Sequence, residues 1–334
     1  MATIKDVARE AGVSISTVSK AINGSYTISE EQIKHIKKIA AQMGYKPNAR
    51  AQTFARKSTR SAVFLSCLDR NTAFVNPHMF EMISGAESSL REKGYSLFLQ
   101  HCEAKDICHI AKGIIDSKSA DGLLIHASVI TRELSIMLTR GNIPHIVIGK
   151  PEKPEAGNSL CWIDNNNCLA GEVAARYLLE LGYKTAVFAG GYETDKISED
   201  RLSGVQNEMK DIVVLRGESS IGDGNRMGLE LLSLPERPQV VICANNHLAY
   251  GCLQAFRSKN VSIPDGISLV AFDDHPFALF MNPPLTTVSI DVYEMGVQAG
   301  KLLVSKIRKP GMQVQSFTTV PTLVARGSTH NVGT

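Results

Sequence analysis

The chain has 334 residues, 43% of them hydrophobic, which is typical of a soluble protein with two or three domains, and its short, broken apolar runs exclude a membrane-spanning helix. Residues 1–20 are charged throughout and the seven cysteines form no CxxC pair, so we expect a cytoplasmic protein with reduced thiols and no membrane partner. The net charge is +3, but residues 1–60 hold 11 Lys+Arg against 4 Asp+Glu and the remainder holds 25 against 29, which indicates a basic head that meets a polyanion.

Three short helices are expected in the head, at residues 3–11, 14–22 and 29–43, because apolar residues recur there at helical spacing between start and stop signals. The start signals are Thr3 with Asp6 as its capping-box partner, Ser14 and Ser29, and the stop signals are Gly12 and Gly44. Two short helices that meet at a glycine-containing turn, braced by a third, are typical of a helix-turn-helix.

The second helix of such a motif lies in the major groove of DNA. In "VSISTVSKAING", Ser14, Thr17 and Ser19 are short donors that can reach phosphates and let the duplex come close. Ile15, Ser16 and Lys20 project outward, and we expect Lys20 to donate to guanine and Ile15 to pack on a thymine methyl group. The alternative is a plain three-helix bundle with a polar second helix, which the basic excess on the same segment disfavours.

Residues 46–60, "KPNARAQTFARKSTR", carry five basic residues and little apolar material. They predict a linker with one or two helical turns after Asn48, too short to be stable alone and ordered on DNA. After residue 60 strands alternate with helices, from "SAVFLSCL" to "ISLVAFDD", and the pattern restarts near residue 168. Two successive α/β halves predict two lobes, with a crevice at the carboxyl ends of the strands.

Three polar residues, Arg201, Asn245 and Asp273, are expected at the carboxyl ends of these strands, facing the crevice. Guanidinium, amide and carboxylate together suit a sugar or another polyol. Three other groups of residues suggest a zinc site, a hydrolytic triad or a phosphate-binding loop, but each lacks part of the pattern that its chemistry requires. His101, Cys102, Cys108 and His109 lack zinc spacing, Asp273-Asp274-His275 has no GxSxG partner, and "GGYETDK" lacks the lysine end of a P-loop. We therefore expect no metal, no cofactor and no catalytic residue.

"TIKDVAREAGVSISTVSKAING", followed by "GYKPNARAQTFA", resembles the DNA-binding head of the LacI/GalR bacterial repressors, and the resemblance extends over the core. It implies an α/β protein with an N-terminal helix-turn-helix three-helix domain and a two-lobed doubly wound α/β core of periplasmic-binding-protein type. The implied domains are residues 1–46 for the head, 47–59 for a hinge helix or linker, and 60–334 for the effector-binding and dimerisation core, with lobe 1 at about 60–162 and 291–320 and lobe 2 at about 163–290 and 321–334.

The resemblance also assigns roles to residues. It places Ile15, Ser16 and Lys20 on base-reading positions; Ser14, Thr17, Ser19, Asn23, Tyr45 and Asn48 on phosphate-contacting positions; Ala51 and Phe54 in the minor groove; and His78, Met79, Lys150, Arg201, Asn245 and Asp273 in the effector pocket. Three residues depart from the family pattern. Lys20 is commonly arginine, Ser219 stands where some members have a stacking aromatic, and Asn246 replaces a common acidic residue.

The function that the resemblance implies is a sequence-specific DNA-binding transcriptional regulator, with repression as the expected sign. Its partners would be a near-palindromic operator DNA, a small effector such as a sugar or sugar derivative, and a second copy in a homodimer, with a tetramer as the alternative. Lys150 suggests an acidic or phosphorylated sugar. A cytoplasmic solute-binding protein without DNA function is the alternative reading, and a doubly wound α/β enzyme is the third.

Overall fold

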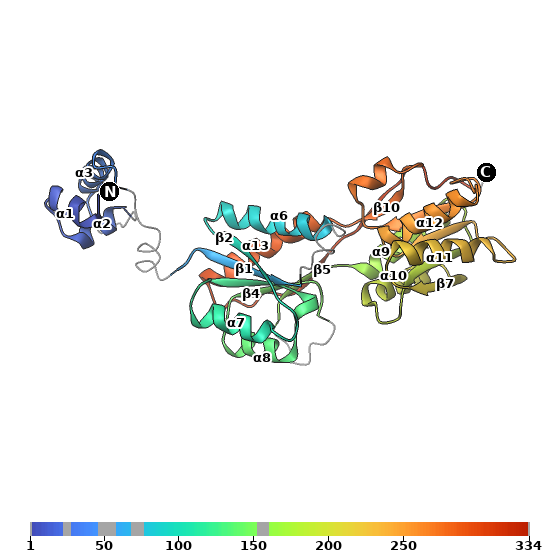
Figure 1. Ribbon diagram of the computed structural model, residues 1–334, viewed down its shortest axis with the longest axis horizontal. Helices are drawn as coiled ribbons and strands as arrows, with labels where there is room; N and C mark the ends of the chain where they lie inside the picture. Colours follow the sequence, from blue (N-terminus) through green and yellow to red (C-terminus); the bar gives the residue numbers. More distant parts are fainter. Residues whose placement is uncertain (1, 23–27, 46–57, 68–76, 152–159, 333–334) are drawn as a thin grey trace. The chain divides into compact units, whose positions relative to one another are not determined.

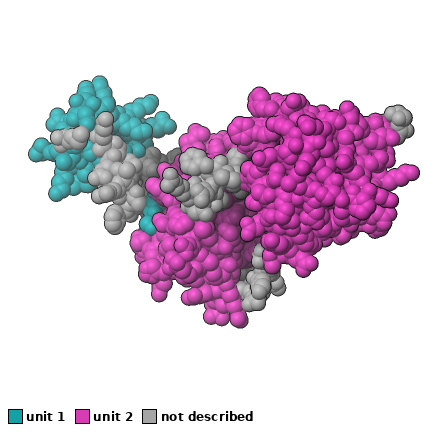
Figure 2. All heavy atoms as spheres, turned by 45° about the vertical axis from the view of Figure 1, so that its right-hand side comes forward, with its two compact units in different colours: residues 1–60, 118–120 teal, residues 61–117, 121–334 magenta. Residues whose placement is uncertain are grey.

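The computed structural model describes residues 2–22, 28–45, 58–67, 77–151 and 160–332. Asn23, Asn48, Ala51 and Phe54 lie outside the described residues, as does most of the expected hinge. The chain divides into two compact units, coloured separately in Figure 2: residues 1–60 with 118–120, and residues 61–117 with 121–334.

The head consists of helices α1 (Ile4–Glu10), α2 (Ile15–Ile22) and α3 (Glu30–Gln42), as the sequence predicts (Figure 1). Thr3 and Asp6 form the expected capping box at α1. The hydroxyls of Ser14 and Ser29 accept hydrogen bonds from the amides of Thr17 and Gln32. Gly12 and Gly44, which follow α1 and α3, have φ values of +62° and +63°, a left-handed conformation that glycine adopts without steric cost.

A small apolar core holds the three helices of the head together. Its buried members come from every helix: Val7, Ala8, Val18, Ala21, Ile36 and Ala40. Ile22, which the spacing of the second helix places inward, is only partly buried, and Ala21 beside it is fully buried. The core side of α2 is therefore set by Val18 and Ala21, three residues apart on one face.

The first lobe of the larger unit is built on a parallel sheet in the order β11-β5-β4-β3-β1-β2. Its strands are β1 (Ser61–Ser66), β2 (Ser96–His101), β3 (Gly122–His126), β4 (His145–Ile148), β5 (Trp162–Asn165) and β11 (Phe317–Thr319). Helices α6 (Pro77–Glu92) and α13 (Val292–Arg308) lie side by side on one face, and α7 (Ile107–Asp116) and α8 (Arg132–Arg140) lie on the other (Figure 1). The short turn η1 (Ala127–Val129) follows β3.

The second lobe repeats this plan with the order β12-β10-β9-β8-β6-β7, in which only the pairing of β12 with β10 is antiparallel. Its strands are β6 (Ala186–Gly191), β7 (Ile212–Gly217), β8 (Val240–Cys243), β9 (Ser268–Phe272), β10 (Thr286–Ser289) and β12 (Thr322–Val324). Its helices are α9 (Asn167–Glu180), α10 (Lys196–Glu208), α11 (Ile221–Leu232) and α12 (Asn246–Ser258), with the short turn η2 (Pro276–Phe280).

The chain passes between the two sheets three times: after Asn165, between Ser289 and Val292, and between Thr319 and Thr322. Each lobe keeps its own apolar core, and the strands of the second lobe are almost entirely buried at β6, β8 and β9. Because the sheets are parallel, the loops at the carboxyl ends of their strands gather at one edge of each lobe, which is where the polar residues of the core lie.

Candidate DNA-binding face and effector site

Helix α2 buries one face in the head and exposes the other. Val18 and Ala21 are fully buried, Ser16 and Lys20 are exposed, and 46% of the Ile15 surface is accessible. The helix contains no acidic residue and its only charge is Lys20, in the last turn. The exposed face therefore offers hydroxyls, one aliphatic side chain and one ammonium group, all of which suit a polyanion with readable base edges.

The hydroxyls at the start of α2 are organised around Ser14. Its Oγ lies 2.9 Å from Ser16 Oγ and 2.8 Å from Thr17 Oγ1, and it accepts a hydrogen bond from the Thr17 amide at 3.1 Å. A helix start of this kind favours an anion, because its backbone amides carry partial positive charge. Ser19 is half-buried, and Tyr45 is half-buried against the core of the head.

In the second lobe, Arg201 is the centre of a polar cluster. Only 3% of its surface is accessible. Its Nη1 donates to the Ala244 carbonyl at 2.6 Å and to Asp273 Oδ2 at 3.1 Å, its Nη2 donates to Asp273 Oδ1 at 2.7 Å, and its Nε donates to Asn167 Oδ1 at 3.1 Å. The guanidinium carbon also lies 4.8 Å from the centroid of the Phe272 ring. Among the described residues, one Nη2 hydrogen has no partner and is available to a ligand.

The backbone holds Asp273 in a strained conformation. Its φ is +72°, a region that non-glycine residues seldom adopt, and its amide donates to the Val288 carbonyl at 3.0 Å. The strain is compensated by the two hydrogen bonds to Arg201, which form a bidentate ion pair. Strained residues that their surroundings hold in place gather at functional sites, which is consistent with a ligand site here.

Helix α12 begins beside this pair. Asn245 is its N-cap, with Oδ1 accepting from the Leu248 amide at 3.0 Å, so the Nδ2 donor is left for another partner. The next residue, Asn246, and Tyr250 one turn later have a buried Oδ1 and a buried hydroxyl with no hydrogen-bond partner among the described residues. Unpartnered buried polar atoms of this kind are uncommon and call for a ligand or water.

Two histidines face one another between the lobes. His78 lies at the start of α6, and its ring centroid is 6.3 Å from that of His275, which follows β9. Both ring nitrogens of His78 are buried without a partner among the described residues. Burial lowers the pKa of His275, and the nearby charge of His78 acts in the same direction. Met79, the neighbour of His78, is buried in the apolar core of the first lobe.

Lys150 and Asp164 meet where β4 and β5 end. The Lys150 amide donates to Asp164 Oδ2 at 3.0 Å, and the exposed Lys150 ammonium lies 5.9 Å from the centroid of the Trp162 ring. Burial raises the pKa of Asp164, although amide hydrogen bonds from Asn165 and Lys150 and the charge of Arg201 oppose that rise. Asp164 therefore brings a half-buried carboxylate into electrostatic reach of the Arg201 cluster.

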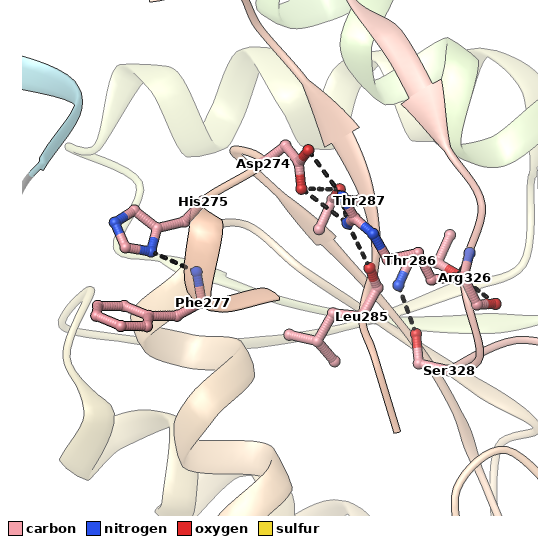
Figure 3. A network of polar contacts seen from close by, with 8 residues as sticks. All are labelled: Asp274, His275, Phe277, Leu285, Thr286, Thr287, Arg326 and Ser328. Carbon is pink, nitrogen blue, oxygen red and sulfur yellow. Dashed lines mark hydrogen bonds and ion pairs between the residues drawn. The ribbon is translucent and has the colours of Figure 1, made fainter. Parts of the chain in front are cut away.

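Asp274, the residue after Asp273, pairs with Arg326 and not with Arg201 (Figure 3). Arg326 Nη1 and Nη2 donate to Asp274 Oδ1 and Oδ2 at 2.7 and 2.9 Å, and Thr287 Oγ1 donates to Oδ1 at 2.8 Å. Burial acts to raise the pKa of Asp274, but these hydrogen bonds outweigh it and lower the pKa below its usual value. His275 Nδ1 accepts from the Phe277 amide at 3.2 Å instead of pairing with Asp274. The Asp-Asp-His run is thus a strand-end loop without the geometry of a hydrolytic triad.

Of the three residues predicted from the sequence, Arg201 and Asp273 are in direct contact, and Asn245 follows Ala244, whose carbonyl accepts from Arg201. Asn167 and Asp164 were not predicted. Both lie in the run "IDNNN" at the end of β5, where four polar residues in a row are a visible signal of a strand-end site. Ser219 is exposed and donates to Asp195 Oδ2 at 3.1 Å. Among the described residues no group of three or more His, Cys, Asp or Glu could hold a metal ion, and none of the described helices is long and apolar enough to cross a bilayer.

A helix-turn-helix with an open second helix, joined in one chain to a two-lobed α/β core with a polar cluster at its strand ends, is the architecture of a ligand-responsive DNA-binding protein. The model of the lacI family of bacterial regulatory proteins matches residues 3–48, and the model of the periplasmic binding protein-like domain matches residues 175–329. The ribose operon repressor of Escherichia coli is 32% identical over 98% of this chain and 100% of its own, and the transcriptional repressor PurR of Vibrio atlanticus is 30% identical over 98% of both.

Solved structures share the fold of this chain. The Lac repressor dimer bound to operator and the anti-inducer ONPF aligns with a TM-score of 0.79 and 20% identity over 98% of this chain and 99% of its own. The complex of the transcriptional regulator CelR with cellobiose aligns with a TM-score of 0.71 and 24% identity over 98% of this chain and 100% of its own. The chain belongs to the LacI family and is a DNA-binding transcriptional regulator with a small-molecule effector.

Proposed function

We propose that a homodimer of this chain represses transcription by placing two α2 helices on a near-palindromic operator, about one helical turn apart. The observation that carries the proposal is the exposed face of α2, on which Ile15, Ser16 and Lys20 stand clear of the core while Val18 and Ala21 are buried. In this proposal Ile15, Ser16 and Lys20 read bases; Ser14, Thr17, Ser19, Asn23, Tyr45 and Asn48 contact phosphates; and Ala51 and Phe54 enter the minor groove.

The effector in this proposal is a sugar or sugar derivative. Its hydroxyls would accept from the free Nη2 hydrogen of Arg201 and from Asn245 Nδ2, and would meet the unpartnered ring of His78. Asp273 fixes Arg201, and we also assign Met79 and Lys150 of the first lobe to the effector site. The ribose operon repressor, at 32% identity over nearly the whole chain, supports a sugar.

Regulation in this proposal follows from differential affinity. An effector can change operator affinity only if it binds one conformation of the dimer more tightly than the other. The chain works as a cytoplasmic, nucleoid-associated regulator, and we assign it no catalytic residue and no cofactor. The domain roles are the head at residues 1–46, the hinge at 47–59 and the effector-binding and dimerisation core at 60–334.

The DNA-binding half is tested by selecting bound duplexes from a random pool with the full chain at low salt. We expect enrichment of a near-palindromic sequence, and an affinity that falls steeply as salt rises, because phosphate contacts release counterions. A chain that binds a sugar yet enriches no duplex would be a solute-binding protein, and that result would overturn the proposed function.

The effector half is tested by thermal unfolding of the full chain against sugars, sugar acids and nucleobases. A ligand that binds only the folded state raises Tm, so a sugar or sugar derivative should do so. The variant Asn245→Ser keeps an oxygen that can cap α12 but loses the Nδ2 donor, so its Tm without ligand should stay near that of the parent while the ligand-induced rise shrinks. A rise with nucleobases alone would contradict the sugar assignment.

A further inference from the structure

Two cysteines lie next to each other at one end of the first sheet. Strands β1 and β2 run parallel, Ser66 and His101 are the last pair of their register, and the Cys102 amide closes that pair by donating to the Ser66 carbonyl at 3.1 Å. Cys67 and Cys102 directly follow this last pair on their two strands, so their backbones lie side by side.

The spacing of this pair suits a covalent bond. Opposed residues of neighbouring strands lie about 4.8 Å apart, and disulfides form between Cα atoms separated by about 4.4–6.8 Å. Both cysteines lie outside the regular ladder, beyond Ser66 and His101, where the backbone can adjust to the angles of a disulfide.

The two thiols differ in access. Cys67 is exposed, whereas only 2% of the Cys102 surface is accessible and its Sγ lies 3.8 Å from the Ser66 carbonyl oxygen. Burial raises the pKa of Cys102 to about 11, and the nearby Cys67 and Asp106 act in the same direction. Because the thiolate is the reactive form, Cys67 is the group that meets an oxidant first, and Cys102 is placed to react with it second.

We propose that Cys67 and Cys102 form a reversible intrachain disulfide when the protein meets hydrogen peroxide. The Cys67 thiolate attacks one peroxide oxygen, the O–O bond breaks, and the departing hydroxide takes up a proton as water, which leaves Cys67 as a sulfenic acid. The Cys102 sulfur then attacks the Cys67 sulfur, the S–O bond breaks, and a second water leaves with the Cys102 proton. Two thiols lose two electrons and one peroxide becomes two waters, and a thiol reductant reverses the change.

Another close pair shows why access matters. Cys243 in β8 and Cys252 in α12 have their sulfur atoms 3.8 Å apart, yet both side chains are fully buried and Cys252 Sγ already lies 3.3 Å from the Gly224 carbonyl oxygen. Burial and the neighbouring thiol raise the pKa of Cys243 well above its usual value. Peroxide has no exposed thiolate to attack there, so this pair stays reduced in the folded protein.

The test treats the reduced full chain with hydrogen peroxide, alkylates the remaining thiols and maps tryptic peptides without reductant. The sequence places Cys67 in peptide 61–70 and Cys102 in peptide 94–105, so their linkage gives one joined mass that dithiothreitol separates. We expect this species in the monomer-sized chain, with two alkylatable thiols lost. Cys67→Ser should abolish it. Cys108→Ser, a half-buried cysteine of the same lobe in peptide 106–112, should leave it unchanged.

Four results would overturn the proposal, and none depends on the effector or on DNA. They are a Cys67 bond between two chains, Cys67 oxidised to sulfinic acid while Cys102 still alkylates, a Cys243–Cys252 bond that forms while Cys67 and Cys102 stay free, and no loss of thiols at all. Because Cys67 is exposed, its serine variant is expected to fold, so the comparison holds even if replacement of the buried Cys102 disrupts the lobe.

Discussion

Successive carboxylates after β9 are held by two arginines from different parts of the second lobe. Asp273 pairs with Arg201 of α10, and Asp274 pairs with Arg326, which follows β12 near the end of the chain. Each carboxylate therefore has its own cation. The Arg201–Asp273 pair borders the proposed effector site. The Arg326–Asp274 pair connects the segment after β12 to the loop after β9.

Loss of the Asp273 charge should be costly. The variant Asp273→Asn keeps the shape of the side chain but leaves the buried Arg201 guanidinium without its counter-ion, and such a change costs about 3 kcal/mol. Urea unfolding measures this difference. In the matched variant Glu87→Gln, the broken pair with Arg91 is solvent-exposed, and the free energy of unfolding should change by less than about 0.5 kcal/mol. Equal decreases in the free energy of unfolding for both variants would contradict the burial of the Arg201–Asp273 ion pair.

Stability should depend on pH through His145. Burial in β4 lowers the pKa of this histidine from 6.5 to about 4, and the charge of Lys306 acts in the same direction. Between these two values the unfolded chain binds a proton that the folded chain does not, so stability falls as pH falls, by about 1.4 kcal/mol per pH unit for this one group.

The variant His145→Gln isolates that contribution. Glutamine can still donate to the Ile143 carbonyl, which lies 2.6 Å from His145 Nδ1, but it does not titrate. The free energy of unfolding, measured by urea between pH 7 and pH 4, should therefore fall less steeply in the variant than in the parent. Parallel curves for the two proteins would mean that His145 has the same pKa in the folded and unfolded chains, which would contradict its burial in β4.

At the scale of elements, the helix pairs of the core approach closely at glycines. A Cβ atom on Gly85 of α6 would collide with the backbone of Tyr293 in α13, whereas a Cβ atom on Gly113 of α7 would meet no described atom within 4 Å. Gly85→Ala should therefore push α6 and α13 apart and destabilise the protein by about 1–3 kcal/mol. Gly113→Ala should be neutral or stabilising by up to about 1 kcal/mol, because alanine is the better helix former. Melting temperatures that fall equally in both variants would contradict the close packing.

Two lysine variants of the head distinguish a contact to bases, which changes sequence preference, from a contact to phosphates, which changes affinity for any duplex. Lys20 and Lys38 are both exposed lysines of the head, on α2 and α3. Lys20→Ala should reduce the preference for the selected operator over an unrelated duplex by about 1–3 kcal/mol, because a base contact is lost. Lys38→Ala should weaken binding to both duplexes alike and leave their ratio unchanged. Fluorescence anisotropy with the two duplexes at one salt concentration measures both ratios.

The elements that the sequence predicts are those with a strong local pattern. The three helices of the head and the long alternating strands and helices of the core formed where apolar spacing and caps indicated them. The short strands β5 and β11 were not predicted, because each has three or four residues and joins the sheet only through pairing with a distant segment. The sequence pointed to Arg201 and Asp273, which the structure joins in an ion pair. The run "IDNNN" marks Asn167 as polar at a strand end, but its contact with Arg201 depends on packing of α9 against α10, which the local sequence does not show.

At the scale of the whole molecule, each lobe of the core has an apolar cluster of its own among the described residues, and three passages of the chain join the two sheets. Separate cores allow each lobe to keep its packing while the passages change their backbone angles, as in hinge motions. Contacts such as the approach of His78 to His275 would then differ between conformations. An effector that contacts both lobes would therefore bind one arrangement of the lobes more tightly than another, and would shift the equilibrium between them.

Coupling of this kind is reciprocal, and that gives the last prediction. If the effector changes operator affinity by some factor, the operator must change effector affinity by the same factor. Two titrations of the full chain measure the factors separately: operator binding with and without saturating effector, and effector binding by calorimetry with and without the selected duplex. Removal of residues 1–60 should leave effector affinity at the value of the DNA-free protein, whichever duplex is added. Unequal factors would mean that effector and operator do not share one conformational equilibrium, and regulation would then require another partner.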